Sequence, residues 1–155
     1  MKNYIEIENE TEISSELCEV IISAVNKVCE KESLPEINIC VLITDREGIR
    51  YINKEYRNID SETDVLSFPY LEYDENFNPI DPESEKDPET GALCLGNMAL
   101  CMDVIEEHAK EYGNTVSQEL FYMTVHSMYH LLGYDHMEEA DKKIMRAKEK
   151  EIIEE

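Results

Sequence analysis

The sequence predicts a single α+β domain over residues 1–155, with a small mixed sheet of about four strands packed with about five helices. Short apolar runs rich in β-branched residues alternate with longer segments whose apolar residues recur every three or four positions. The length suits one domain, and a hydrophobic content of 42% is enough to build a core. We find no internal repeat.

The first half of the chain supplies most of the predicted strands. In chain order we expect a strand around residues 5–7, a helix over 13–28, a buried strand at 37–43, a helix reaching Arg57, and a strand ended by Pro69. Thr44 and Glu47 have the spacing of a capping box at the start of the second helix. Residues 72–90 are rich in proline and acids, which predicts a solvated loop.

The second half is expected to be mainly helical. A strand at 92–96 should be followed by a helix over 98–112. Thr115 and Gln118 form another capping box, and the helix that follows runs to Leu132 before Gly133. Apolar residues surround that helix, so we expect it to be the buried central helix. A last, charged helix should start near His136, with Asp135 as its N-cap or as a partner of a histidine.

Charge and cysteine usage narrow the class of protein. Thirty-six acids against 14 basic residues give a net charge of −22, so the overall field should repel nucleic acid and anionic membranes. The N-terminus lacks the pattern of a signal peptide, and no apolar run approaches a membrane span. The five cysteines form no CxxC pair, which favours reduced cysteines in a cytoplasmic protein over a cysteine zinc site.

The stretch HSMYHLLGYDH holds three of the four histidines. His126 and His130 are four residues apart, so a helix places both on one face. Gly133 can end the helix and turn the chain so that His136 reaches the same point. Three imidazoles suit one Zn²⁺ ion and leave a fourth position open, as in catalytic sites. The alternative is that these are satisfied core histidines, but three at these intervals favour a metal site on the central helix.

The same spacing occurs in metzincin proteases, with one difference. Those enzymes need a glutamate after the first histidine as general base, and Ser127 stands there. Peptide hydrolysis by that route is therefore disfavoured. We expect Ser127 to be a spacer without a catalytic role.

A basic stripe precedes the strand that ends at Pro69. It consists of Arg46, Arg50, Lys54 and Arg57, spaced to fall on one helix face. In so acidic a chain, such a stripe is where phosphate would bind. The alternative is a solvated helix face whose cations pair with Glu47 and Glu55.

Two motifs in this chain resemble those of a known family. HSMYHLLGYDH is similar to the H-G-x-L-H-L-x-G-Y-D-H signature of the YbeY family, bacterial endoribonucleases that mature rRNA. NKEYRNIDSETDVLSFPY resembles that family's second block, N-x-x-Y-R followed by T-D-V-L-S-F-P. The order of motifs agrees over most of the chain. Two departures are visible: Ser127 replaces a glycine, and Asn97 replaces an acid.

The resemblance implies a zinc-dependent endoribonuclease that acts on single-stranded rRNA, in 16S rRNA 3′-end maturation and ribosome quality control. It implies His126, His130 and His136 as ligands of one Zn²⁺ and Arg57 as the catalytic residue. It also implies association with the small ribosomal subunit and its proteins, and no membrane partner.

A second interpretation is a non-catalytic ribosome-assembly protein whose zinc is structural, which the −22 charge favours slightly. A zinc peptidase comes third. We expect the fourth histidine, His108, to be an exposed helix residue, with approach to the metal site as the alternative.

Overall fold

A four-stranded mixed sheet forms the centre of the molecule. The computed structural model describes residues 3–134 and 139–153. Across the sheet the order is β1-β2-β4-β3, formed by β1 (Tyr4–Asn9), β2 (Ile37–Thr44), β4 (Leu93–Cys101) and β3 (Val65–Pro69). β1, β2 and β4 run parallel, whereas β3 pairs antiparallel with β4 and forms an edge. The predicted α+β class is confirmed.

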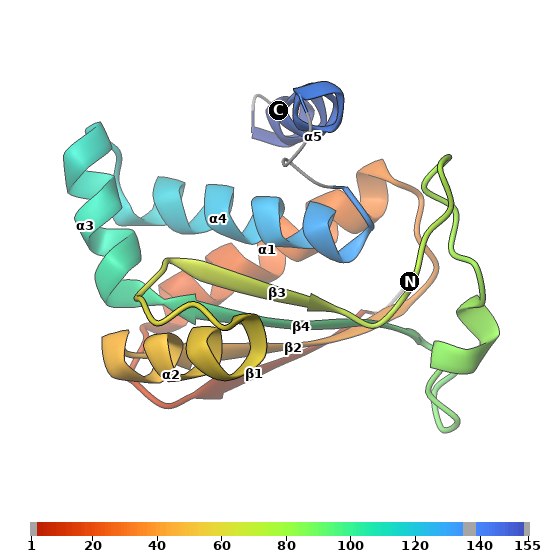
Figure 1. The fold of residues 1–155 in the computed structure, drawn as a ribbon, viewed down its shortest axis with the longest axis horizontal. Helices are drawn as coiled ribbons and strands as arrows, with labels where there is room; N and C mark the ends of the chain where they lie inside the picture. Colours follow the sequence, from red (N-terminus) through yellow and green to blue (C-terminus); the bar gives the residue numbers. More distant parts are fainter. Residues whose placement is uncertain (1–2, 135–138, 154–155) are drawn as a thin grey trace.

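Helices cover both faces of this sheet (Figure 1). α1 (Ser15–Lys31) and α4 (Val116–Leu131) lie on one face, and α2 (Arg46–Arg57) lies on the other. α3 (Met102–Tyr112) stands at one end, next to α4. α5 (Glu139–Ile153) contacts α4 and α1, and a short 3₁₀ helix η1 (Pro82–Glu85) interrupts the acidic loop. None of the helices described has the length and apolar character needed to span a membrane.

The two faces bury two separate apolar clusters. The larger one, between the sheet and α1 and α4, contains Ile39, Val41, Leu100, Leu120 and Met128, all at most 1% exposed. The smaller one, under α2, is built around Ile49, Leu66, Ala99 and Cys101. α4 is buried over most of its length, as expected for a central helix.

Two local predictions are wrong. β4 continues to Cys101, and α3 begins only at Met102, where we expected a helix from Met98. The apolar run over 98–101 is compatible both with a helix and with a strand buried on both faces. These residues form a strand because they pair with β2 on one side and β3 on the other. α2 is capped by Asp45, whose side chain accepts from the Gly48 N–H at 2.7 Å, so Thr44 and Glu47 form no capping box. The Thr115–Gln118 capping box is confirmed.

The end of α4 depends on Gly133. Its φ of +95° suits glycine, and a Cβ built there would lie 2.6 Å from the Tyr73 ring. Tyr73 stays close because its hydroxyl donates to the Leu131 carbonyl at 2.8 Å. The acidic loop thus fixes the point at which the chain leaves the central helix.

Candidate active site

His126 and His130 come together on α4 as their spacing predicts. Their Nε2 atoms are 3.2 Å apart, and both side chains are partly buried. Two nitrogens bound to a tetrahedral zinc at about 2.0–2.1 Å would be separated by about 3.3 Å. The observed separation therefore fits two ligands of one zinc ion. His136, the third predicted ligand, lies outside the described residues.

Glu149 of α5 orients this pair. Its Oε2 lies 2.6 Å from His126 Nδ1, and its side chain is only 3% exposed. An ionised carboxylate only accepts, so this contact suits the tautomer of His126 that carries its proton on Nδ1 and presents Nε2 as a ligand atom. A histidine held by a carboxylate in this way is typical of a metal ligand. Sequence reasoning missed Glu149 because its helix carries only a general charged pattern.

Arg57 is the last residue of α2 and reaches the edge strand β3. Its Nη2 donates to the Ser67 carbonyl at 2.5 Å, and its guanidinium lies 5.6 Å from the Phe68 ring centroid. Arg57 is exposed, and within the described residues it forms no ion pair with an acid. The remaining guanidinium donors are therefore available to an anionic ligand.

The other arginines of the basic stripe are already paired. Arg46 binds Glu62 at 3.2 Å and Glu107 at 2.8 Å. Arg50 binds Asp60 at 2.7 Å, and this hydrogen bond lowers the pKa of the Asp60 carboxyl. The alternative of a solvated, paired helix face is thus right for these two, although their partners are not Glu47 and Glu55. Only the Arg57 end of the stripe keeps an arginine without a carboxylate partner in the described structure.

A buried hydroxyl pair links Arg57 to the histidine helix. Ser127 Oγ lies 2.7 Å from Ser67 Oγ, in the interface between α4 and β3. Ser67 also accepts the Arg57 hydrogen bond through its carbonyl, and Ser127 directly follows His126. Two hydrogen bonds therefore connect the arginine to the metal-type pair. Ser127 is more than a spacer in packing, because its hydroxyl holds the strand to the helix.

Asn97 lies on the opposite face of the sheet from these histidines. It shares the α2 face with Ala99 and Cys101, and its Nδ2 donates to the Tyr70 hydroxyl at 2.8 Å. Its departure from the family's acid therefore does not change the surroundings of the histidine pair.

His108 was expected to be an exposed helix residue, and this prediction is wrong. Its side chain is 32% exposed, and Nδ1 lies 3.2 Å from Asp64 Oδ2. Asp64 stands just before β3, so this contact joins α3 to the edge strand. The pairing required knowledge of the tertiary structure, because the two residues are 44 positions apart.

Other metal-type groups carry less weight. Glu6 and Glu8 of β1 and Cys40 of β2 bring ligand atoms within 4.8 Å of one another, but both glutamates are exposed, and exposed acidic groups are common without a metal. All five cysteines are free in the structure. In the described structure, the histidine pair with Glu149 is thus the better supported metal position.

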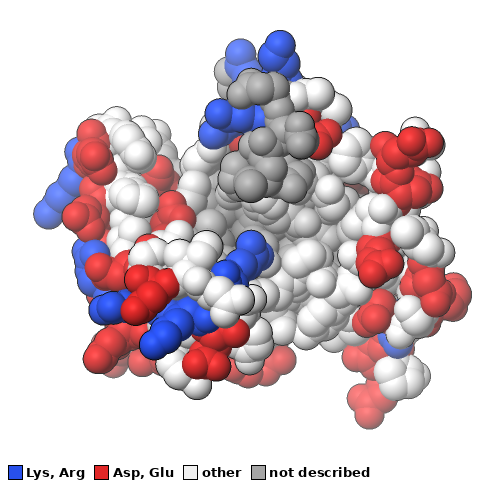
Figure 2. All heavy atoms as spheres, in the orientation of Figure 1, with Lys and Arg blue, Asp and Glu red and all other residues white. Residues whose placement is uncertain are grey.

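Charge is unevenly distributed on the face that Figure 2 shows. Acidic side chains gather at both sides of this face, while its middle is largely uncharged. Basic side chains lie beside this uncharged area, over α2 (Figure 2). On this face, a polyanion would meet least repulsion over the uncharged area and the neighbouring basic side chains of α2.

Comparison with known proteins identifies the family. The sequence model of the family described as endoribonuclease YbeY matches residues 4–155. The chain belongs to the YbeY family. A relative named endoribonuclease YbeY from Lachnospira eligens is 43% identical over 159 residues, covering 97% of this chain and 94% of the relative. One from Clostridium botulinum is 42% identical, covering 94% and 92%.

A solved structure extends this likeness to the fold. The solution structure of TM1509 from Thermotoga maritima matches with a TM-score of 0.63 and 28% sequence identity. The match covers 97% of this chain and 87% of that protein. The YbeY family assignment thus agrees in sequence and in architecture.

Proposed function

We propose that this chain is a metal-dependent endoribonuclease that cuts single-stranded rRNA in the cytoplasm. Its family membership and the names of its relatives, endoribonuclease YbeY, support RNA cleavage. The observation that carries the proposal is the arrangement of an arginine without an acidic partner and a carboxylate-held histidine pair, linked through Ser67 and Ser127. The specific task would be 3′-end maturation of 16S rRNA and ribosome quality control.

The metal would be held by His126 and His130, with His136 as the third ligand. Imidazole nitrogens suit zinc, and the 3.2 Å separation of the two Nε2 atoms fits it. When bound, zinc supplies Lewis acidity toward a phosphoryl oxygen or water. Glu149 would keep the His126 ring in the orientation and tautomer that ligation needs.

Arg57 would contact the phosphate group that is cut. Its side chain carries five N–H donors, and the Ser67 carbonyl takes one of them. That hydrogen bond fixes the guanidinium before RNA arrives, so little reorganisation is needed as charge develops on the phosphoryl oxygens. Phe68 lies against the same group and further restricts its movement.

The acidic surface favours a basic protein as the docking partner. With a charge of −22, binding to free RNA should be weak, whereas basic proteins of the small ribosomal subunit would be attracted. The alternative is an assembly protein without catalysis. It does not explain why Arg57 has no acidic partner in the described structure. The comparisons also favour the nuclease.

Cleavage of a labelled single-stranded rRNA fragment tests this function. The purified protein should cut the fragment, lose activity after chelation, and regain it when zinc is added back. A double-stranded fragment of the same sequence is the control and should stay intact. Binding to the small subunit without cleavage in any metal condition would instead establish the assembly protein.

A further inference from the structure

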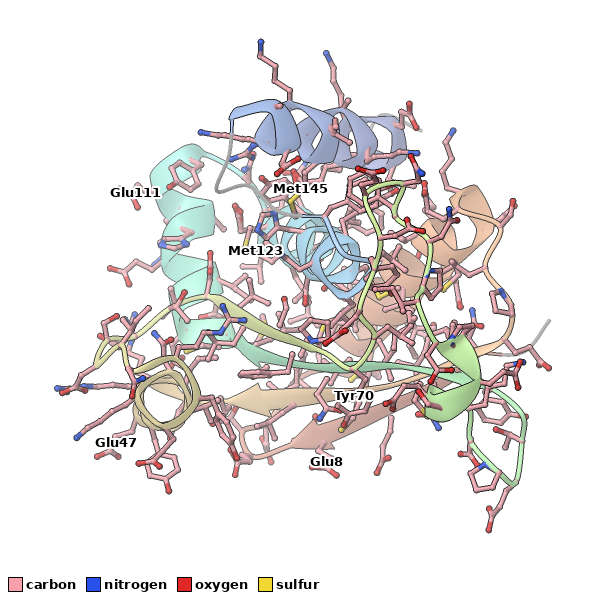
Figure 3. All side chains as sticks on the ribbon, turned by 45° about the vertical axis from the view of Figure 1, so that its right-hand side comes forward. Glu8, Glu47, Tyr70, Glu111, Met123 and Met145 are labelled. Atoms are coloured by element: carbon pink, nitrogen blue, oxygen red, sulfur yellow. The ribbon has the colours of Figure 1, made fainter. Side chains whose placement is uncertain are left out.

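A cavity lined by titratable and aromatic residues lies beside the histidine pair and is not used by the proposed mechanism. It has a volume of about 580 Å³ and lies among α3, α4, α5 and the residue preceding β3. Its lining includes Asp64, His108, Glu119, Tyr122 and Arg146. Figure 3 shows Met123, another lining residue, beside the space between α3 and α4, whereas Glu111 lies on the outer side of α3. A volume in this range is typical of small-ligand sites.

Glu119 is the feature of this cavity that most needs explanation. The residue is only 4% exposed, and its buried Oε2 has no hydrogen-bond partner in the described structure. Burial raises the pKa of this carboxyl. A buried carboxylate oxygen without a donor is costly, so a ligand that supplies N–H donors would relieve that cost.

The surrounding groups exclude a small bare ion as the best occupant. Asp64 Oδ2 is already 3.2 Å from His108 Nδ1. Together with Glu119, these residues do not bring three ligand atoms within 4.8 Å of one another; in the described structure only Glu6, Glu8 and Cys40 do so. These residues therefore do not form a compact ligand cluster, and the cavity is better suited to a larger group that carries hydrogen-bond donors.

Aromatic rings and position point to a nucleobase. Tyr112 and Tyr122 line the cavity, and rings of this kind stack with bases of single-stranded RNA. The Tyr122 ring centroid is 6.1 Å from that of His126, so the cavity adjoins the metal-type pair. Arg146, whose side chain is half exposed, donates to the Tyr122 hydroxyl and pairs with Glu149 at 3.8 Å, so it holds Tyr122 at the side of the cavity that faces α5.

We propose that this cavity binds a guanine base of single-stranded RNA, in the nucleotide next to the cut, with Glu119 accepting hydrogen bonds from it. Guanine is the base whose Watson–Crick edge presents two adjacent donors, at N1 and N2. Uracil presents one donor between two carbonyl oxygens, which Glu119 and Asp64 would repel. The inference rests on the proposed function for its substrate class, because it assumes that RNA is the ligand.

Nucleotide binding tests the cavity without requiring cleavage. Guanosine 5′-monophosphate and uridine 5′-monophosphate are titrated separately into the full-length protein, followed by NMR shifts of the cavity residues. The wild type should bind the guanine nucleotide about tenfold more tightly, the size expected for a well-made pair of base contacts. Glu119→Gln should reduce this preference to within twofold. Glu111→Gln, on the outer side of α3, is the matched control and should keep it.

A cleavage experiment then places the cavity relative to the cut. Oligonucleotides that differ only in the nucleotide on either side of the cleaved bond should be cut faster with guanine at one of these positions. Glu119→Gln should remove that preference, so that guanine-containing and uracil-containing oligonucleotides are cut at similar rates. If the wild type binds guanine selectively but cuts no RNA, the nuclease function fails while the cavity assignment stands.

Three results would overturn the guanine site. These are equal affinity of the wild type for both nucleotides, an unchanged preference in Glu119→Gln, and binding of Mn²⁺ alone that Glu119→Gln abolishes and nucleotides do not displace. If Glu119→Gln lowers the melting temperature, Asp64→Asn replaces it and should cause the same loss of preference. A preference that survives in a folded Asp64→Asn variant would count against the proposal equally.

Discussion

Two histidine–carboxylate pairs lie near each other in this molecule, and they differ in what the second ring nitrogen meets. His126 pairs with Glu149 at 2.6 Å, and its Nε2 meets His130. His108 pairs with Asp64 at 3.2 Å, and no second histidine lines the cavity that these two residues border in the described structure. The same pairing thus gives a metal-type site in one place and part of an open cavity in the other. A carboxylate–histidine contact alone does not mark a metal.

Burial separates the two pairs as clearly as their neighbours do. Glu149 and His126 have side chains 3% and 15% exposed, against 21% and 32% for Asp64 and His108. A buried, short pair fixes a ring, whereas a partly exposed pair is screened by water and contributes little rigidity. We therefore expect perturbations of the first pair to affect metal and catalysis, and those of the second to affect ligand selectivity.

The largest expected effect is on metal content. His130→Ala should reduce zinc from about one ion per chain to nearly none and lower the melting temperature, because zinc binding contributes to folded-state stability. His108→Ala is the matched control from the other pair and should retain zinc. Elemental analysis of dialysed protein measures both. If His130→Ala retains one zinc ion per chain, the His126–Glu149 pair is no more a metal site than the His108–Asp64 pair.

The next effect is on the rate of cleavage. Arg57→Ala removes a fixed donor from a developing charge, which typically costs on the order of 10²–10³ in rate. Zinc content and melting temperature should be nearly unchanged, since Arg57 is exposed and makes no ion pair within the described residues. Arg50→Ala, whose charge already pairs with Asp60, should change the rate much less. Normal cleavage or unfolding of Arg57→Ala would show that this residue is not catalytic.

A smaller effect sharpens the comparison of the carboxylates. Glu149→Gln should weaken zinc affinity about 10–100-fold, since it removes the acceptor that orients His126. Asp64→Asn makes the equivalent change in the other pair and should leave zinc affinity unaltered. Competition with a chelator of known affinity measures both variants. Equal weakening by the two substitutions would mean that the cavity and the metal position are one site.

The smallest effect on activity is expected at the serine link. Ser127→Ala leaves the buried Ser67 hydroxyl without its partner, which should lower the free energy of unfolding by about 1–3 kcal/mol. Cleavage should stay within a few-fold of wild type, because the hydroxyl has no neighbouring base that could activate it. Denaturant unfolding and the RNA assay give the two values. A large loss of cleavage in a stable variant would assign Ser127 a catalytic role.

Local spacing predicted the parts of the site that one helix can determine. His126 and His130 meet because four residues span about one helical turn, and Thr115 caps that helix as its sequence indicates. Glu149 and Ser67 could not be found this way. They lie 23 residues after His126 and 60 residues before Ser127, and only tertiary packing brings them close.

The same limit explains the error at the start of α3. Residues 98–101 are apolar throughout, so neither a period of two nor one of 3.6 stands out. Partner strands on both sides stabilise the extended form. The predicted fold class is still correct, because the other helices and strands show clear hydrophobic periodicity and clear start and stop residues in the sequence.

Anomalous scattering at the zinc edge, from crystals of the zinc-loaded protein, tests the central claim most directly. We expect one strong peak about 2.0–2.1 Å from the Nε2 atoms of both His126 and His130, with His126 Nδ1 still in contact with Glu149. A peak among Glu6, Glu8 and Cys40, or in the cavity of Asp64 and His108, with none at the histidine pair, would contradict it.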